Sequence, residues 1–259
     1  MPVLNTPADV AVARLLMPVI RETLAKGADA SRPLIAKNGL SDTFVDPALK
    51  WLERRGAEVR FNARIDGIVR DDRMVTALAN DSGTEQLGRD DGVVLAVPPW
   101  AAAPLIDGIS MPDRFAPIVN VHFKLESTEV PGMTSPLLGL VGSVSHWIFK
   151  RENIISITIS AADQLAQQPN DKIAQLVWNE VRQAIRMDGS AQPPVRVIKE
   201  RRATFVATPD QLARRPAHRT DINNLALAGD WIDTGLPATI EGAIRSGELA
   251  AKTLRKLIA

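Results

Sequence analysis

Apolar residues recur along the chain at two different spacings, and the spacing separates predicted helices from predicted strands. Apolar positions three and four residues apart predict helices at 8–26, 47–55 and 170–187. Pro18 is expected to kink or interrupt the first helix, and Pro47 lies in the first turn of the second. The third helix is strongly amphipathic. Its expected buried stripe consists of Ile173, Leu176, Val177, Val181 and Ile185.

Shorter apolar runs, separated by turn clusters such as 71–72 and 81–83, predict a series of strands. These runs lie at 57–61, 64–69, 74–79, 118–125, 137–141, 147–150, 154–159 and 195–205. The run at 93–97 contains no polar residue and stops at two prolines, which is typical of a strand buried on both faces. The pattern predicts one α/β unit with an antiparallel insertion at about 108–205.

The most informative pattern begins at the apolar run 225–228. This run is followed by Gly229, Asp230 and a turn that contains glycine and proline. The helix after the turn carries small and large apolar residues on one side: Ala243, Gly247, Ile240 and Ile244. The order predicts a buried strand, a carboxylate at its carboxyl end, and a helix whose free N–H groups face that carboxylate. Open α/β folds bind ligands at such junctions.

Composition and charge narrow the function classes. The 259 residues are 45% hydrophobic and 24% charged, which is ordinary for a globular protein. A net charge of +1 argues against a nucleic-acid surface. The absence of cysteine excludes disulfides and thiol nucleophiles, and the three scattered histidines predict no metal site. No run is long enough to span a bilayer and no secretory signal is evident, so we expect a cytoplasmic protein with at most peripheral contact with the inner membrane.

Several motifs resemble those of known flavoproteins. The segments 228–230 and 241–243 (Ala-Gly-Asp and Glu-Gly-Ala) resemble the carboxyl-terminal flavin motif of the amine oxidase/phytoene desaturase superfamily. Further matching segments are 4–7 (LNTP), 139–142 (GLVG), 157–163 (ITISAAD), 199–205 (KERRATF) and 235–242 (GLPATIEG). Together they look like the squalene-associated FAD-dependent desaturases, also called hydroxysqualene dehydroxylases. The resemblance covers nearly the whole chain.

The resemblance implies a fold class and a division of the chain. The expected fold is α/β (α+β), corresponding to the carboxyl-terminal part of a two-domain FAD-dependent amine oxidase/phytoene desaturase-like fold with an antiparallel substrate-domain sheet. Residues 36–107 and 206–259 are expected to belong to the FAD domain, and residues 1–35 and 108–205 to the substrate domain.

The resemblance also implies which residues bind FAD. They are Gly229, Asp230, Ala238, Thr239, Ile240 and Ile65. The Asp230 carboxylate is expected by the ribityl and pyrophosphate part, the Ile240 N–H at the flavin ring, and the Ile65 backbone at the adenine. Each residue also has a plainer interpretation: Asp230 as an aspartate in a turn, Ile240 as an ordinary helix start, and Ile65 as a residue in the core of a strand. No catalytic side chain is identified.

One family feature is missing. The superfamily opens with a strand, a Gly-x-Gly-x-x-Gly turn and a helix that hold the FAD pyrophosphate, whereas this sequence contains no Gly-x-Gly. The sequence therefore predicts a truncated product, a fragment, or one half of a split protein. FAD binding is expected to need a separate Rossmann half.

The resemblance implies reduction of hydroxysqualene, an isoprenoid lipid, to squalene by hydride transfer from reduced FAD. Such a substrate needs an apolar, tunnel-like pocket. Its expected wall is drawn from Leu137, Leu138, Leu140, Val141, Trp147, Ile148 and Phe149, about half of which must face away. Three alternatives stay open: a carotenoid-type desaturase, an amine oxidase, and a non-catalytic subunit. The absence of tyrosine disfavours the amine oxidase, whose substrate cage usually contains aromatic side chains.

Overall fold

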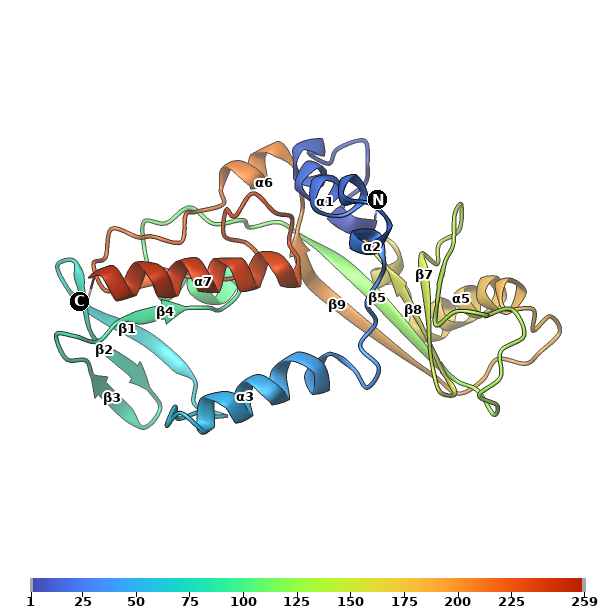
Figure 1. The fold of residues 1–259 in the computed structure, drawn as a ribbon, viewed down its shortest axis with the longest axis horizontal. Helices are drawn as coiled ribbons and strands as arrows, with labels where there is room; N and C mark the ends of the chain where they lie inside the picture. Colours follow the sequence, from blue (N-terminus) through green and yellow to red (C-terminus); the bar gives the residue numbers. More distant parts are fainter. Residues whose placement is uncertain (1, 258–259) are drawn as a thin grey trace.

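The computed structural model describes residues 2–257, which form two regions joined by two long strands (Figure 1). The joining strands are β5 (Phe115–Lys124) and β9 (Val195–Phe205), which pair antiparallel along most of their length. We call the part built around them the large-sheet region. The part at the other end, which contains both halves of the flavin-like motif, is called the small-sheet region.

The large-sheet region is a five-stranded antiparallel sheet covered on one face by a helix. The strand order is β6-β7-β8-β5-β9. The remaining elements are β6 (Leu137–Gly139), β7 (Trp147–Arg151), β8 (Ile154–Ile159) and α5 (Asn170–Ala184). Alternate residues of the central strands, including Val121, Phe123 and Ile157, point at α5 and are completely buried. The antiparallel insertion predicted from the sequence is therefore present.

Helix α5 confirms four of the five residues predicted for its buried stripe, and Leu176 is the exception. Ile173, Val177, Val181 and Ile185 are fully buried, whereas Leu176 is 41% exposed. At 100° per residue, Leu176 lies roughly 60° outside the arc that these four residues span. Trp178 lies on the opposite edge of that arc and takes the buried place against Phe123.

The small-sheet region contains two separate sheets and a long helix. One sheet is antiparallel: β1 (Ile65–Asp71), β2 (Met74–Asn80) and β3 (Gly83–Gln86). In the other, β4 (Val93–Leu95) pairs parallel with β10 (Leu225–Leu227), and α7 (Ile240–Leu257) packs on one face of the pair. The strand at 225–228 is buried as predicted. The prediction that the strand at 93–97 is buried on both faces was wrong, because Val94 beside α7 is 41% exposed.

Two other predicted elements differ in the structure. The helix expected at 8–26 is reduced to α1 (Leu16–Glu22) between short 3-10 turns. Pro18 lies in the first turn of α1, where the missing N–H has no helical acceptor to lose, so it helps to begin the helix. The strand expected at 57–61 is irregular chain, and Phe61 is exposed.

The helix predicted at 47–55 is present as α3 (Asp46–Glu53), next to a π turn at Ser41–Val45. Short elements that were not predicted are β3, α2 (Ala28–Ser31), α4 (Pro99–Ala102) and α6 (Pro209–Ala213).

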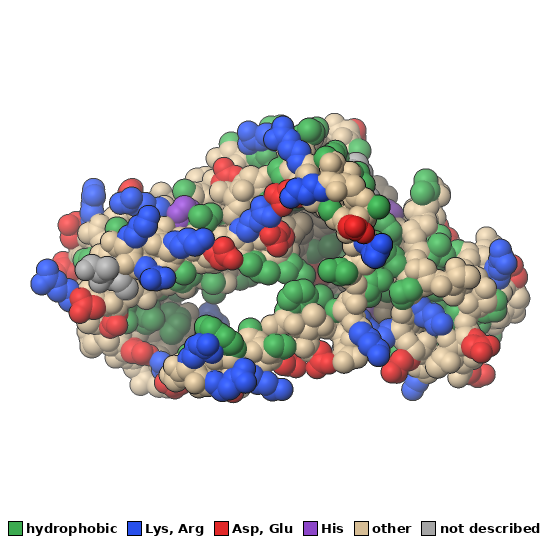
Figure 2. All heavy atoms as spheres, viewed as in Figure 1, with side chains coloured by type: hydrophobic (Ala, Val, Ile, Leu, Met, Phe, Trp, Pro, Cys, Tyr) green, Lys and Arg blue, Asp and Glu red, His purple; other side chains and the backbone are tan. Residues whose placement is uncertain are grey.

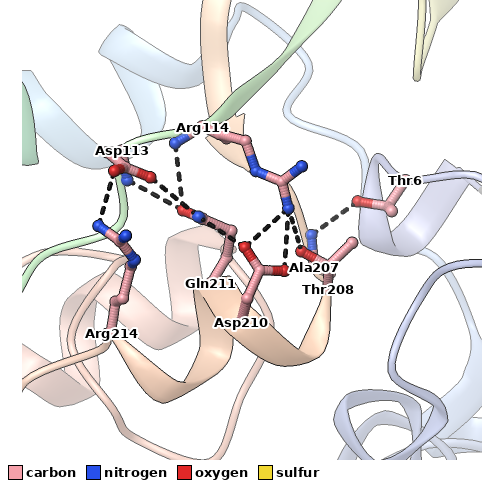
Figure 3. Close-up of polar contacts among 8 residues, drawn as sticks. All are labelled: Thr6, Asp113, Arg114, Ala207, Thr208, Asp210, Gln211 and Arg214. Carbon is pink, nitrogen blue, oxygen red and sulfur yellow. Dashed lines mark hydrogen bonds and ion pairs between the residues drawn. The ribbon is translucent and has the colours of Figure 1, made fainter.

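Polar side chains fasten the two regions together where β5 begins and β9 ends. Asn5 donates to the Ala116 carbonyl at 3.1 Å and to the Thr204 hydroxyl at 2.9 Å, and so binds both long strands. Figure 3 shows the neighbouring network around α6. There the Gln211 side-chain oxygen accepts the backbone N–H groups of Asp113 and Arg114 at 2.9 and 3.1 Å. These bonds fix the direction in which the chain leaves β9 toward residue 225.

Candidate functional site

The junction between β10 and α7 begins with a glycine that no other residue could replace without movement. Gly229 has φ +142°, and a Cβ atom there would lie 2.5 Å from Trp231 Nε1. The Trp231 indole is buried and donates from Nε1 to the Val97 carbonyl at 3.0 Å. The absent side chain at Gly229 thus lets the indole tie the loop to the end of β4.

The start of α7 faces the same junction. Its first turn is capped by Thr239, whose hydroxyl accepts the Gly242 N–H at 3.1 Å. Within residues 2–257, the backbone N–H of Ile240 has no hydrogen-bond acceptor. Ser246 accepts the Gly229 N–H at 2.8 Å and so holds α7 against the end of β10. The helix therefore presents an open N–H and a partial positive charge beside the loop.

The Asp230 carboxylate is half-buried in this loop. Burial raises the pKa of its carboxyl group, and the positive charge of Arg215 opposes that rise. The backbone N–H groups of Asp230 and Trp231 also oppose the rise in pKa, and no side chain of the described residues donates a hydrogen bond to the carboxylate. Most of its acceptor capacity is therefore available to a ligand.

Two hollows lie beside the junction. The Asp230 hollow has a volume of about 290 Å³ and is lined by Trp100, Phe115 and Phe205 in addition to Asp230. The β4 groove has a volume of about 680 Å³ and runs along β4 from Ile65. Trp100 lines both hollows and stacks edge-on against Phe115, with ring centroids 4.7 Å apart. Asp230 and Ile65, far apart in the sequence, thus border adjacent spaces.

The residues predicted to bind FAD therefore gather around one part of the molecule. Gly229 and Asp230 follow β10, and Ala238, Thr239 and Ile240 lead into α7. Ile65 opens β1 on the far side of the β4 groove. Their roles toward the cofactor stay predictions.

Sequence reasoning missed Arg215, which lies in a Pro/Arg-rich loop with no distinguishing pattern. Its side chain is only 1% exposed and reaches the backbone of the loop that follows Gly229. The sequence offered only one signal, namely that the arginine precedes a proline shortly before the buried strand.

The candidate wall for an isoprenoid divides between the two faces of the large sheet. Leu137 pairs with Phe149, and Trp147 lies on the same face, away from α5. Ile148, Leu138 and Leu140 contact the core under α5, so they belong to the half of the set that was expected to face away from a substrate. Val141 is fully exposed on the loop after β6, so it lines nothing.

The histidines have ordinary structural partners. Nδ1 of His146 accepts the Ser160 N–H at 3.1 Å, and burial lowers the pKa of His146. His122 lies 2.8 Å from the Ser156 hydroxyl, and burial and then the Arg196 charge lower its pKa. Among residues 2–257 no cluster of three His, Asp or Glu side chains is placed to hold a metal ion. No helix in this part of the chain has the length and apolar character needed to cross a membrane.

Comparisons with known proteins show which family the chain belongs to. The chain is 44% identical to hydroxysqualene dehydroxylase from Sinorhizobium fredii over 233 residues, which cover 90% of this chain and 55% of the relative. It is 25% identical to 15-cis-phytoene desaturase from Glycine max, covering 86% of this chain and 45% of the relative. The chain therefore spans about half the length of these relatives.

The fold is similar to that of a putrescine oxidase triple mutant made in a redesign of cofactor binding. That match has a TM-score of 0.67 and 14% identity, and covers 98% of this chain and 62% of the other. The sequence pattern of the flavin-containing amine oxidoreductases matches residues 8–255. The chain belongs to the flavin-containing amine oxidoreductase family.

Proposed function

We propose that this chain is the flavin-facing part of an FAD-dependent oxidoreductase that reduces hydroxysqualene to squalene. The observation that carries the proposal is the 44% identity to hydroxysqualene dehydroxylase over 90% of the chain. Identity to the phytoene desaturase is much lower, at 25%. Reduction is therefore favoured over desaturation.

The residues at the junction fit FAD. Asp230 offers free acceptor sites that suit sugar-like hydroxyl groups. The open N–H of Ile240 and the helix start suit the negative charge of a reduced flavin or a phosphate. Gly229 leaves the loop backbone open to close approach. This donor set supports FAD as the cofactor.

The proposed reaction replaces an allylic hydroxyl with hydrogen. Reduced FAD, when bound, supplies the hydride; the hydroxyl takes up a proton and departs as water. The alkene stabilises the electron-poor carbon, so the chain must mainly orient the substrate and exclude solvent. Trp100, Phe115 and Phe205 give one part of the Asp230 hollow an apolar surface that suits both tasks, whereas Glu200 and Arg202 make another part polar.

The remainder of an isoprenoid needs an apolar surface. We place it along the face of the large sheet that lies away from α5, where Leu137, Trp147 and Phe149 are only partly buried. Replacing Trp147 with Asp is expected to weaken turnover of hydroxysqualene, whereas the same change at fully exposed Val141 serves as the control.

We also propose that a Rossmann half bearing Gly-x-Gly-x-x-Gly completes the FAD site, in the same or in a separate polypeptide. Figure 2 shows hydrophobic side chains at the rim of an opening between α7 and α3. Ile240 and Ile244 on α7, Trp51 on α3 and Phe44 in the π turn before α3 are each about half exposed. Within residues 2–257, β4 pairs only with β10, so its other edge faces the β4 groove. A strand and helix added there would cover these groups.

The test compares the chain alone with the chain produced together with the part of the Sinorhizobium fredii relative that it does not span. The complex is expected to be yellow, to elute as one species, and to convert hydroxysqualene to squalene with chemically reduced FAD. Squalene is measured by gas chromatography with mass spectrometry, and phytoene is the competing substrate. Flavin uptake without squalene formation contradicts the reaction, and formation of a desaturated phytoene product indicates the carotenoid alternative. A colourless preparation contradicts the flavoprotein proposal itself.

The lipid nature of the proposed substrate supports peripheral membrane contact. We expect the protein to sediment with vesicles that contain hydroxysqualene more than with vesicles that lack it. Equal recovery with both contradicts this part of the proposal.

A further inference from the structure

Arg215 binds the loop after Gly229 through four backbone carbonyls. Its guanidinium donates from Nε to Trp231 O at 3.3 Å, from Nη1 to Leu236 O at 2.9 Å, and from Nη2 to Asp230 O at 3.4 Å. Nη2 also donates to Ile232 O. One side chain therefore ties together the whole segment between the carboxylate and the turn that leads into α7.

Among the described residues, no fully buried carboxylate neutralises this buried guanidinium. Asp233 Oδ1 lies 3.8 Å away, but that side chain is mostly exposed. The Phe205 ring centroid lies 5.0 Å from Cζ, which provides a weak cation–π contact. Burial lowers the pKa of Arg215, and Asp233 and then Asp230 oppose that effect. Carbonyl dipoles are thus the main compensation for a buried positive charge.

Burying a charge costs free energy, so it is an unfavourable way to hold a loop in one conformation. A well-packed apolar side chain often stabilises a fold as well as a buried ion does. The charge lies next to the half-buried Asp230 carboxylate and to the segment that leads into α7. Both the carboxylate and the helix start are candidates for contact with FAD, whose phosphates and reduced ring are negatively charged.

We propose that Arg215 is a positioning residue of the flavin site. It holds Asp230–Leu236 so that the Asp230 carboxylate and the start of α7 face one ligand, and its positive charge favours the reduced cofactor. The inference rests on the proposed function, because FAD is the ligand.

Lysine and methionine variants of Arg215 separate positioning of the loop by hydrogen bonds from the effect of the positive charge. The Arg215→Lys variant keeps the charge but cannot spread donors across four divergent carbonyls, because an ammonium group is a point charge. The Arg215→Met variant loses both the charge and the donors. The matched control is Arg214→Met. The neighbouring Arg214 points outward and pairs with Asp113 at 2.6 Å (Figure 3).

The first measurement needs no cofactor. Hydrogen exchange of the peptide 229–239 is followed in the flavin-free chain, with 154–159 in the large sheet as an internal reference. Both Arg215 variants are expected to exchange faster in 229–239 only, and Arg214→Met to behave as the unmodified chain. Unchanged exchange in both Arg215 variants overturns the proposal, whatever the fate of the proposed function.

The second measurement uses the flavin-loaded complex. Arg215→Lys is expected to bind oxidised and reduced FAD roughly 10-fold more weakly while keeping the midpoint potential. Arg215→Met is expected to weaken binding of reduced FAD about 10-fold more than binding of oxidised FAD. This difference lowers the midpoint potential of the bound FAD by about 30 mV, because the couple transfers two electrons. Equal weakening of both forms in Arg215→Met overturns the charge role. If the unmodified complex takes up no flavin, the proposed function fails and this inference fails with it.

Discussion

The two regions of the molecule each bury an apolar core, but they leave different amounts of apolar surface uncovered. In the large-sheet region, Phe123, Ile157 and Val177 meet between the sheet and α5 with no exposed surface. In the small-sheet region, α7 covers β10 with one face, while Ile240 and Ile244 on another face remain 52% and 47% exposed. Both regions therefore have a core, which in the small-sheet region includes Leu225, Trp231 and Ile232. The small-sheet region also leaves apolar side chains of α7 exposed, and the candidate flavin site lies beside them.

The small-sheet region relies more on buried polar side chains. Asn224, Ser246 and Arg215 are all buried, and each binds backbone groups from another segment. Such bonds fix the direction of the chain without requiring a thick apolar core. The arrangement suits the proposed ligand site, because a bound ligand would cover apolar side chains that the described chain leaves exposed.

The largest expected difference between the regions comes from removing one isoleucine side chain in each. Ile157→Ala leaves a cavity in a closed core and is expected to lower the unfolding free energy by about 3–4 kcal/mol. Ile244→Ala in the chain alone removes a half-exposed side chain and should cost less than about 1 kcal/mol. Urea denaturation followed by circular dichroism measures both. Equal losses would show that α7 is already covered in solution.

Replacing a buried asparagine tests how much the buried polar side chains stabilise the small-sheet region. Asn224 accepts the Val75 N–H at 2.8 Å and donates to the Val75 carbonyl at 2.9 Å and the Asp91 carbonyl at 3.2 Å. Asn224→Leu leaves these groups without partners and is expected to cost about 2–3 kcal/mol. Asn223→Leu, at the exposed neighbouring position, is the control. A similar loss in both variants would mean that the bulk of leucine, not the lost bonds, causes the effect.

Two glycines should respond to alanine with opposite signs. At Gly132, beside the end of α5, a Cβ atom would lie 2.5 Å from the Ile185 backbone, so alanine is expected to cost about 2 kcal/mol. At Gly247, inside α7, nothing lies within 4 Å of the added atom. Alanine there should stabilise the chain by up to about 1 kcal/mol, because it restricts the unfolded backbone. Thermal denaturation of the two variants is sufficient, and a loss at Gly247 would contradict the openness of this face.

Secondary structure was predicted most accurately from the sequence where a periodic pattern or a motif extended over many residues. The strand at 195–205 has the predicted bounds, and the strand-to-helix junction at 225–240 forms as expected. The strand at 57–61 failed because alternation alone cannot supply a pairing partner. The prediction that Leu176 is buried was wrong because a helix buries only a limited arc of its surface. Trp178, on the opposite edge of that arc, fills the space near Phe123.

Residues that act through the backbone could not be found from the sequence. Arg215 and Asn224 bind carbonyl and amide groups, which every residue carries, so their partners leave no pattern along the chain. The motif located Asp230 and Ile240, but the tertiary structure was needed to reveal what holds them. The sequence therefore predicted a candidate site, whereas the residues that support it could not be predicted.

The smallest expected effect lies at the junction of the two regions and depends on pH. The side chains of Thr208 and Gln211, together with the Arg114 charge, lower the pKa of Asp210 to about 2 from its ordinary 3.8. Figure 3 shows Gln211 and Arg114 donating to this carboxylate. Because the unfolded chain binds more protons between these two values, the unfolding free energy should fall as the pH drops from 3.8 to about 2. Asp210→Asn is expected to remove this part of the pH dependence, whereas Asp107→Asn, on an exposed loop, leaves it in place. Urea midpoints from about pH 2 to about pH 5 provide the measurement. Parallel curves for the unmodified chain and Asp210→Asn would show that the network around α6 does not stabilise the junction through this carboxylate.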